Sequence, residues 1–483
     1  MSSFFPRRSR PRPESTSSER PAVSSAASDA RRKLPDLPSF EDQWGGIPEA
    51  GRVAATPGPR LVPTQDELVR QGLAGIRPDE ADDREIDSPS ESRLRIVESD
   101  PVERIPDVQR PGTLDRPLRV GVIGVGYGGS VHIPALMHLP EAEVLAVCAR
   151  TTARAIAVAA SRQIPLVTTD FRQVINETSI DAVVIAAPPY LHHQMVIAAL
   201  EAGKHVLCES PMGRSLAESR DMAKMADSAS VTAMVNHHLR YDPLRSRIRE
   251  LIMGGYIGVP QAITVNIVRS TFPDAYARPY GWRSQLERGG GALGAIGTQE
   301  IDVLRWWLGE IDSVAGTAAT MVERHVHPAG SGMMRADADD NFACVLRFAS
   351  GMIGTVHVTT TAGVESGEEI MISGSEGMLI AQNGGVLLGA KRGEAEMSHI
   401  EVATPEDDAL PPETHPTMHG TYRLLRRWVE AIREGEPTPS PSFHDGAKAQ
   451  EIVDGIRRSG QQARWIDTAG RRFQTAIPRH VSV

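Results

Sequence analysis

The sequence predicts an α/β protein in which a doubly wound parallel sheet is followed by a second α/β domain with a mostly antiparallel sheet. Two patterns carry this prediction. Between residues 117 and 238, short apolar runs rich in β-branched residues alternate with segments of helical periodicity, as in β-α-β units that build a parallel sheet. From residue 239 onward, longer strands alternate apolar and polar residues and follow one another through short turns, which is typical of antiparallel sheets covered on one face.

Residues 1–116 differ from both domains and are predicted to form a disordered N-terminal extension. They are rich in Pro, Ser, Arg, Asp and Glu, with few aromatic residues. Stretches such as SSERPAVSSAASDARRK cannot bury enough apolar surface to offset the entropy of the chain. We expect at most a transient helix near TQDELVRQGLAG. The extension could bind an unknown partner, although a solvated tail is the simpler interpretation.

The first domain, residues 117–238, opens with a buried strand at 118–124, followed by a helix that stops near Pro140. Further strands are expected at 142–150, 165–169, 180–189, 205–210 and 231–237. Helices are expected between them at 153–163, 170–177, 191–203 and 216–230. The helix at 191–203 ends on Gly203, a residue suited to the left-handed conformation that closes many helices.

The second domain, residues 239–483, begins with a helix at 243–258. Strands are expected at 260–270, 314–323, 340–351 and 352–363, and a hairpin at 368–382. Between the first two strands, GGGALGAIGTQEIDVLRWWLG is expected to be a glycine-rich entry into a helix. Two helices, at 421–435 and 444–460, close the ordered chain.

Composition limits the classes of function. The chain has 483 residues, of which 40 % are hydrophobic, and a formal net charge of −9, so it offers no general attraction for nucleic acid. Its three cysteines form neither a disulfide framework nor a zinc-binding pattern, and no metal site is expected. No apolar run is long enough to span a bilayer, and no export signal is apparent. We therefore expect a cytoplasmic protein with a small-molecule substrate.

A dinucleotide-binding motif follows the first strand. Gly124, Gly126, Tyr127, Gly128 and Gly129 belong to GVGYGG, a G-x-G-x-x-G pattern between a predicted strand and a predicted helix. Gly124 permits the tight turn, Gly126 lets the backbone approach a pyrophosphate, and Gly129 lets helix and strand pack closely. The start of the helix then offers free N–H groups to phosphate. We expect a Rossmann domain that binds NAD or NADP.

The end of the second strand favours NADP over NAD. An NAD site usually carries an acidic residue there, which bonds the ribose 2′-hydroxyl. Ala149 takes that position here, and Arg150 and Thr151 follow it. A guanidinium pairs well with a 2′-phosphate, although Arg150 is also compatible with a solvated loop.

Several stretches together resemble the Gfo/Idh/MocA oxidoreductases. They are RVGVIGVGYGGSVHIPAL, APPYLHHQMVIAALEAGKHVLCE before a proline, GWR with GGGAL, and HDGAKAQEIVDGIRRSG. The likeness runs from about residue 117 to about residue 475. It implies a Rossmann domain and an α/β domain with an open sheet that often supports dimers or tetramers. It also implies a nicotinamide cofactor and hydride transfer at a carbinol carbon of a sugar or cyclitol.

The resemblance also assigns residues to the cofactor site. It implies that four of them lie near the cofactor, namely Pro188, His192, Glu209 and Arg240. Trp282 and Arg283 match a Trp-Arg pair that reaches NADP in some members.

The chain departs from the family at three positions. The family's catalytic lysine follows the glutamate of a Glu-Lys-Pro motif, and an Asp and a His from the segment after GGGAL assist it. Here Ser210 takes the lysine position, Ala295 the Asp position and Gln299 the His position. None of these three side chains titrates near neutral pH, so the usual proton transfer is missing.

Three explanations remain open. The chain is still a reductase, but for a conjugated or imine bond, or it takes its proton from another group, for which His237, His238 and Tyr241 in NHHLRYDP are candidates. Alternatively, it binds a dinucleotide without turnover, as a sensor, scaffold or partner subunit. A third possibility is a lyase or hydrolase reaction that uses the bound nicotinamide.

Overall fold

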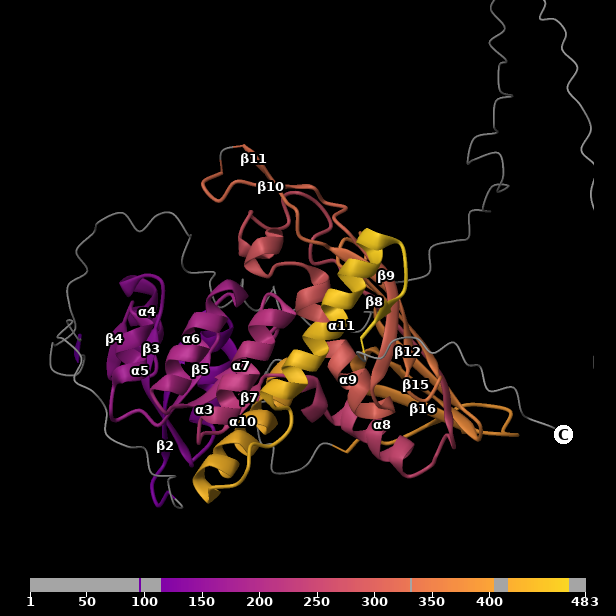
Figure 1. The fold of residues 1–483 in the computed structure, drawn as a ribbon, viewed down its shortest axis with the longest axis horizontal. Helices are drawn as coiled ribbons and strands as arrows, with labels where there is room; N and C mark the ends of the chain where they lie inside the picture. The colour runs from indigo at the N-terminus through magenta and orange to yellow at the C-terminus, as the bar shows by residue number, and fades with distance from the viewer. Residues whose placement is uncertain (1–94, 97–113, 331, 404–415, 469–483) are drawn as a thin grey trace, which may run out of the picture. The chain divides into compact units, whose positions relative to one another are not determined.

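The computed structural model describes residues 95–96, 114–330, 332–403 and 416–468 (Figure 1). Most of the predicted N-terminal extension therefore lies outside the described residues. The suggestion that it binds a partner stays a prediction. Within the described part, the chain forms a seven-stranded sheet, a nine-stranded sheet and a two-stranded ribbon. Among the helices of these residues, none combines the length and the apolar character needed to cross a bilayer.

The seven-stranded sheet is parallel throughout and confirms the predicted Rossmann-type domain. Its strand order is β1-β4-β3-β2-β5-β6-β7. The strands are β1 (Arg95–Ile96), β2 (Leu118–Ile123), β3 (Ala142–Cys148), β4 (Leu166–Thr168), β5 (Ala182–Ile185), β6 (His205–Cys208) and β7 (Ala233–Val235). The two-residue strand β1 pairs in parallel with Leu166 and Val167 of β4, an edge strand that the sequence pattern did not predict.

Helices cover both faces of this sheet, because its strands are apolar on both sides. The helices of the domain are η1 (Gly128–His132), which continues into α3 (Ile133–Met137), α4 (Thr152–Ala160), α5 (Phe171–Asn176), α6 (Pro189–Glu201) and α7 (Leu216–Ser228). On one face, α3 shares a core with α10 (Pro416–Glu434), which includes the fully buried Trp428. On the other face, α5, α6 and α7 share a core with the start of α11 (Phe443–Gln462).

The nine-stranded sheet is antiparallel except for the pair β8–β13, which confirms the predicted second sheet. Its order is β17-β16-β15-β14-β8-β13-β12-β9-β18. The strands are β8 (Pro260–Val268), β9 (Ile311–Ala319), β12 (Asn341–Phe348), β13 (Ile353–Thr359), β14 (Gly367–Gly374), β15 (Gly377–Gln382), β16 (Val386–Lys391), β17 (Ser398–His399) and β18 (Ile466–Asp467). The ribbon β10 (Arg324–Val326) and β11 (Met333–Arg335) stands apart from it.

One face of the second sheet is covered and the other is open. The helices α8 (Pro243–Met253), α9 (Thr298–Leu308) and the second half of α11 pack on the covered face. Strand β12 alternates accordingly, with Phe342, Cys344 and Leu346 buried and the side chains between them pointing outward. On the open face, Ile353 of β13 is 51 % exposed and Met371 of β14 is 38 % exposed.

The helix α11 belongs to both cores. Phe443 and Ala447, near its start, pack against the first sheet, whereas Ile452 and Ile456 pack against the second. The sequence prediction assigned the whole of 239–483 to the second domain, yet α10 and the start of α11 complete the core of the first. A hydrophobic periodicity reveals which face of a helix is buried, but it does not say against which sheet.

Candidate functional site

The candidate site lies at the carboxyl ends of the parallel strands. The strand order reverses between β2 and β5, and ligands of open α/β sheets bind in the crevice outside such a switch point. The predicted functional residues follow successive strands at this edge. Gly124 follows β2, Arg150 follows β3, Pro188 follows β5, Glu209 follows β6 and His237 follows β7.

The glycine turn after β2 fits a dinucleotide. Gly124 has φ +103°, and a Cβ atom there would lie 2.4 Å from the carbonyl oxygen of Ala186, so the fold itself requires this glycine. A Cβ atom on Gly126 would meet nothing within 4 Å. The fold therefore leaves open space at Gly126, which is what the close approach of a pyrophosphate needs.

The closest packing of the following helix is at Gly128 rather than at Gly129. A Cβ atom on Gly128 would lie 3.0 Å from Cγ1 of Val122 in β2, whereas one on Gly129 would make only ordinary contacts of 3.5 Å or more. The role predicted for Gly129 thus belongs to its neighbour. Tyr127 packs edge-on against the ring of His132, with the ring centroids 5.4 Å apart.

Arg150 and Thr151 are exposed at the end of β3. Thr151 precedes α4 but does not cap it with its side chain. The backbone carbonyl of Cys148, two residues earlier, accepts a hydrogen bond of 2.9 Å from the N–H of Gly124. The exposed Arg150 therefore follows directly on the strand end that is bonded to the glycine turn.

His192 is a buried residue that connects two backbone segments of the site. Its Nε2 lies 2.7 Å from the carbonyl oxygen of Ala187, and its Nδ1 lies 3.1 Å from that of Pro211. The ring is buried, and burial lowers its pKa. Both nitrogens face backbone carbonyls, so His192 ties the turn at Pro188 to the segment after β6 and does not offer a polar atom to a ligand.

Glu209 is the centre of a polar cluster. Its Oε1 accepts hydrogen bonds from Nε2 of His132 and, at 2.7 Å, from Nδ2 of Asn236. Its Oε2 faces the backbone N–H of Ser210 at 3.2 Å. Burial would raise the pKa of Glu209, but the hydrogen bond and charge of His132, the charge of His238 and the Asn236 amide together hold it below its usual value.

Gln299, in the family's histidine position, links Asn236 to His238. Its Nε2 lies 2.8 Å from the carbonyl oxygen of Asn236 and 3.3 Å from Nδ1 of His238. The opposite amide orientation would set two oxygens against each other, so the amide N–H faces Nδ1. The proton of His238 then resides on Nε2. Burial is the main cause that lowers the pKa of His238 to about 4, so this half-buried imidazole is neutral at physiological pH.

Unsatisfied polar atoms gather in the same place. Among the described residues, buried side-chain atoms without a hydrogen-bond partner include Nδ1 of His132, Oγ of Ser210, Oδ1 of Asn236, Nε2 of His237 and Oε1 of Gln299. Each such atom costs about 1–3 kcal/mol. Because these atoms gather at one sheet edge, we expect ordered water or a polar ligand to bind there and supply the missing hydrogen bonds.

His237 and Arg240 are committed to a buried carboxylate. Nδ1 of His237 lies 2.9 Å from Oδ1 of Asp302, without the alignment of a hydrogen bond. Arg240 pairs with both oxygens of Asp302, at 2.6 and 2.7 Å, and reaches Asp445 at 2.9 Å. Burial opposes the ionisation of Asp302, but the charges of His237 and Arg240 outweigh it and lower its pKa to about 2. The guanidinium of Arg240 is therefore engaged by two carboxylates inside the protein, and its expected place near the cofactor stays a prediction.

Tyr241, Trp282 and Arg283 make contacts of other kinds. The hydroxyl of Tyr241 donates to the carbonyl oxygen of Ser440 at 2.9 Å, and burial is the main cause that raises its pKa. The guanidinium of Arg283 stacks on Trp282 at 4.7 Å. Gly290 packs against the backbone of this pair.

The segments that contain Ser210 and Ala295 approach each other across the two domains. Ala295 is exposed in the π-helical turn η5 (Leu293–Gly297) that precedes α9. A Cβ atom on the neighbouring Gly294 would lie 3.8 Å from Cγ of Pro211. The three positions that depart from the family thus belong to one region, with Gln299 one turn further along the helix.

The sequence interpretation missed His132 and Asn236. His132 lies 77 residues from Glu209 in the sequence, and Asn236 lies 63 residues from Gln299. A signal was present in each case, because a polar residue occurs where apolar ones are expected. His132 interrupts the apolar face of the first helix, and Asn236 directly follows an apolar strand.

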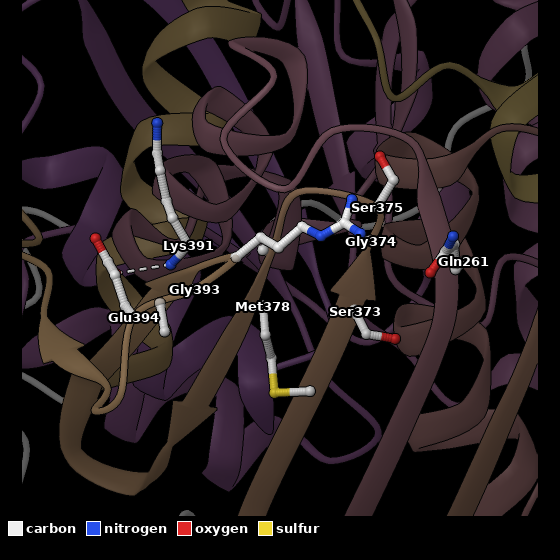
Figure 2. Close-up of a pocket in the computed structure, with 11 residues that line it drawn as sticks. Gln261, Ser373, Gly374, Ser375, Met378, Lys391, Gly393 and Glu394 are labelled. Atoms are coloured by element: carbon white, nitrogen blue, oxygen red, sulfur yellow. Dashed lines mark hydrogen bonds between the residues drawn. The ribbon is translucent and has the colours of Figure 1, made fainter.

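An open pocket lies elsewhere. It has a volume of about 590 Å³ and opens among β8, β14, β15 and β16 (Figure 2). Its lining includes Ser375, Met378 and Lys391, and the backbone N–H of Lys391 donates to Glu394 at 2.8 Å. None of the chemical groups at the carboxyl ends of the parallel strands contributes to it.

Comparison with known proteins agrees with this geometry. Residues 118–237 match the family described as "Oxidoreductase family, NAD-binding Rossmann fold", and residues 246–380 match the "GFO/IDH/MocA C-terminal domain". Levoglucosan dehydrogenase of Pseudarthrobacter phenanthrenivorans is 30 % identical over 394 residues, which cover 72 % of this chain and 98 % of that protein. 1,5-Anhydro-D-fructose reductase of Ensifer adhaerens is 31 % identical, with coverage of 68 % and 92 %.

A solved structure of levoglucosan dehydrogenase in complex with NADH and levoglucosan is also similar. It superimposes with a TM-score of 0.66 at 27 % identity, and the match covers 73 % of this chain and 99 % of that one.

Replacing Gly126 separates cofactor binding from folding. The substitution Gly126→Ala adds a methyl group in open space, so we expect an unchanged melting temperature. The same methyl group obstructs a pyrophosphate, and a penalty of about 1.4 kcal/mol already weakens binding about tenfold. Titration calorimetry with NAD and NADP measures this loss. Gly128→Ala is the control, since its methyl group would press on Val122 and lower the melting temperature. Unchanged affinity in Gly126→Ala would contradict the assignment of the turn.

Proposed function

Because the chain belongs to the Gfo/Idh/MocA family of NAD-binding oxidoreductases, we propose that it interconverts a hydroxyl and a carbonyl group on a small sugar-like molecule. The cluster of Glu209, His238 and Gln299 beside the glycine turn carries this proposal. A bound nicotinamide dinucleotide supplies the donor or acceptor of hydride. The residues that would hold it are Gly124, Gly126 and the first turn of the following helix, with Arg150 at the ribose end.

His238 is the proposed hydrogen-bond donor to the substrate oxygen. Gln299 fixes its tautomer, with the proton on Nε2, and its low pKa keeps the ring neutral. A neutral imidazole that donates to a carbonyl oxygen stabilises the charge that develops there during reduction. Gln299 thus acts as a positioning residue, where other members of the family carry a histidine.

The polar character of the cluster supports a hydroxylated substrate. The atoms without partners include both acceptors, such as Oδ1 of Asn236 and Oε1 of Gln299, and the hydroxyl of Ser210. A sugar or cyclitol carries hydroxyl groups that can both donate to these acceptors and accept from donors. The similar proteins act on levoglucosan and 1,5-anhydro-D-fructose, by their names.

A second candidate is dinucleotide binding without turnover. It is favoured by the amide of Gln299, whose N–H groups are engaged inside the protein, and by Ala295, which has no polar group at all. Under this alternative, the chain would bind the dinucleotide and respond to it as a sensor or partner subunit.

The proposal includes a preference for NADP and a cytoplasmic location of the protein. The exposed Arg150, with no carboxylate at Ala149, supports NADP over NAD, although a similar structure was solved with NADH. The three cysteines are free and buried, which is consistent with a reducing cytoplasm.

The open face of the second sheet is the proposed contact with a second copy of the chain. Thr264 of β8 lies between Thr355 of β13 and Met371 of β14 in register, and all three are exposed. A sheet face that carries small and apolar side chains at its centre favours burial against another protein surface. A dimer or tetramer would cover it.

Turnover distinguishes the two candidate functions. We expect the protein to reduce or oxidise NADP(H) with at least one member of a panel of sugars, anhydrosugars and cyclitols, measured by the absorbance of the reduced nicotinamide. His238→Ala should lower kcat about a hundredfold, whereas His193→Ala, on the surface of α6, should not. Because the pKa of His238 is about 4, protonation of His238 should contribute no change in the reduction rate as pH passes through 6.5. Binding without turnover on the whole panel would favour the sensor.

Replacing Arg150 tests the proposed preference for NADP over NAD. Removing a charge-assisted hydrogen bond costs about 1.5–3 kcal/mol, so Arg150→Ala should weaken NADP binding about 10–100-fold. The affinity for NAD should barely change. The exposed Arg458 offers a control, since Arg458→Ala also removes one surface charge. Equal losses for both dinucleotides would refute the assignment to a 2′-phosphate.

A charge on the open face should separate the subunits. We expect light scattering of the native protein to give a multiple of the chain mass of 52.3 kDa. Thr264→Arg places a charge at the centre of the face and should yield the monomer with an intact circular dichroism spectrum. The control is Met253→Glu, at an exposed helix end. A native protein that is monomeric would contradict the proposed contact.

A further inference from the structure

We infer that Glu209, held by His132, replaces the missing lysine as the group that exchanges a proton with the substrate oxygen. The inference rests on the proposed function and assigns the proton transfer that Ser210 cannot perform. Glu209 directly precedes Ser210 at the end of β6. Its carboxylate therefore starts from the backbone position next to the one that carries the lysine in other members.

The two oxygens of Glu209 have different tasks. Oε1 is engaged by His132 and Asn236. Among the described residues, Oε2 accepts a hydrogen bond only from the backbone N–H of Ser210, at 3.2 Å. The side chain of Glu209 is 14 % exposed, whereas that of His132 is fully buried. His132 thus anchors the carboxylate from inside, and the second oxygen is the part that a ligand can reach.

Glu209 and His238 are close enough to influence each other. The charge of Glu209 opposes the fall in the pKa of His238, and His238 contributes to the lowered pKa of Glu209. Their roles are complementary, because a neutral imidazole donates a hydrogen bond and a carboxylate accepts a proton. One substrate oxygen can therefore be held by His238 and deprotonated by Glu209.

Burial tunes Glu209 for this task. Burial is the largest influence on its pKa and acts upward, against His132, His238 and Asn236. A substrate that removes the remaining water from its exposed part strengthens the upward influence. The lowered pKa keeps the carboxylate ionised in the free protein, and loss of the remaining water raises this pKa when the site fills.

The proposed proton transfer accompanies the hydride transfer, and atoms and charge are conserved in both directions. In the oxidation direction, the O–H bond of the substrate breaks, its proton passes to Oε2 of Glu209, and the C=O double bond forms as the carbon loses hydride to the nicotinamide dinucleotide. In the reduction direction, the same proton returns to the oxygen. Lys204 does not compete for this role, because its ammonium group donates to the carbonyl oxygens of Glu177 and Ile180 at the opposite end of β6.

Glu209→Gln tests the inference on the full chain. The amide keeps the size of the side chain but cannot accept the proton, so kcat should fall about 10²–10⁴-fold, while dinucleotide binding persists. Glu218→Gln is the matched control, since Glu218 is also partly buried but pairs with Arg214, and its kcat should stay unchanged. A Glu209→Gln protein that folds, binds the dinucleotide and retains kcat would overturn the inference.

Chemical rescue separates proton transfer from a structural role. Glu209→Ala should recover activity when formate is added, because formate can occupy the vacated position and accept the proton. A structural role alone would not respond to formate. If either variant fails to fold, Glu209→Asp keeps the charge beside His132 but withdraws it by one methylene group. Full kcat in Glu209→Asp, or no rescue of a folded Glu209→Ala, would count against the inference.

The pair with His132 has a readout that needs no substrate. The pKa of Glu209 is lowered by folding, so its ionised form stabilises the fold above the ordinary value of 4.5 and loses this effect as pH falls through the folded pKa. The melting temperature of the native protein should exceed that of Glu209→Gln near neutral pH and converge with it in acid. An equal difference in melting temperature at all pH values would contradict the pair.

The proposed function and this inference can fail separately. If the native protein turns over no substrate, the proposed function fails. If the native protein and Glu209→Gln both turn over substrate at the same rate, only this inference fails.

Discussion

The buried ion pair between Arg240 and Asp302 is the contact on which the candidate site depends. Arg240 follows the two histidines after β7, and Asp302 follows Gln299 on α9. Their bidentate pairing therefore fixes the distance between His238 and Gln299, which belong to different domains. Asp445 adds the start of α11 to the same junction. Because a buried charge without its partner costs several kcal/mol, these three segments hold one another in a single arrangement.

The helices and strands could be predicted well from the sequence. The contacts between residues far apart in the sequence could not. Local periodicity was enough for the parallel sheet, the glycine turn and the hairpin around SGSEGM, since each depends on neighbouring residues. It was not enough for Arg240, which the family resemblance assigned to the cofactor. The carboxylates that occupy this guanidinium lie 62 and 205 residues away. Likewise, the partnership of His132 with Glu209 follows from the proximity of two strand ends, and no spacing within the chain reveals it.

The positions that the family resemblance assigns to catalysis remain mostly polar. Ser210 and Gln299 do not titrate near neutral pH, but both can form hydrogen bonds. Gln299 lies within hydrogen-bond distance of His238, and the backbone N–H of Ser210 donates to Oε2 of Glu209. The resemblance predicts that three groups are missing, and the structure reveals that two histidines, His132 and His238, lie near the same carboxylate. This is why the departures at three positions do not by themselves imply an inert protein.

The helix α11 has a consequence for how the chain is made. It contributes apolar side chains to the cores of both sheets, yet it follows strands β1–β17 in the chain. Until α11 has been synthesised, a strip of each core remains without its cover, so neither domain can complete its packing. The two domains therefore acquire their native stability together, once α11 is in place, and a chain that is cut short before Phe443 exposes apolar surface in both halves at once.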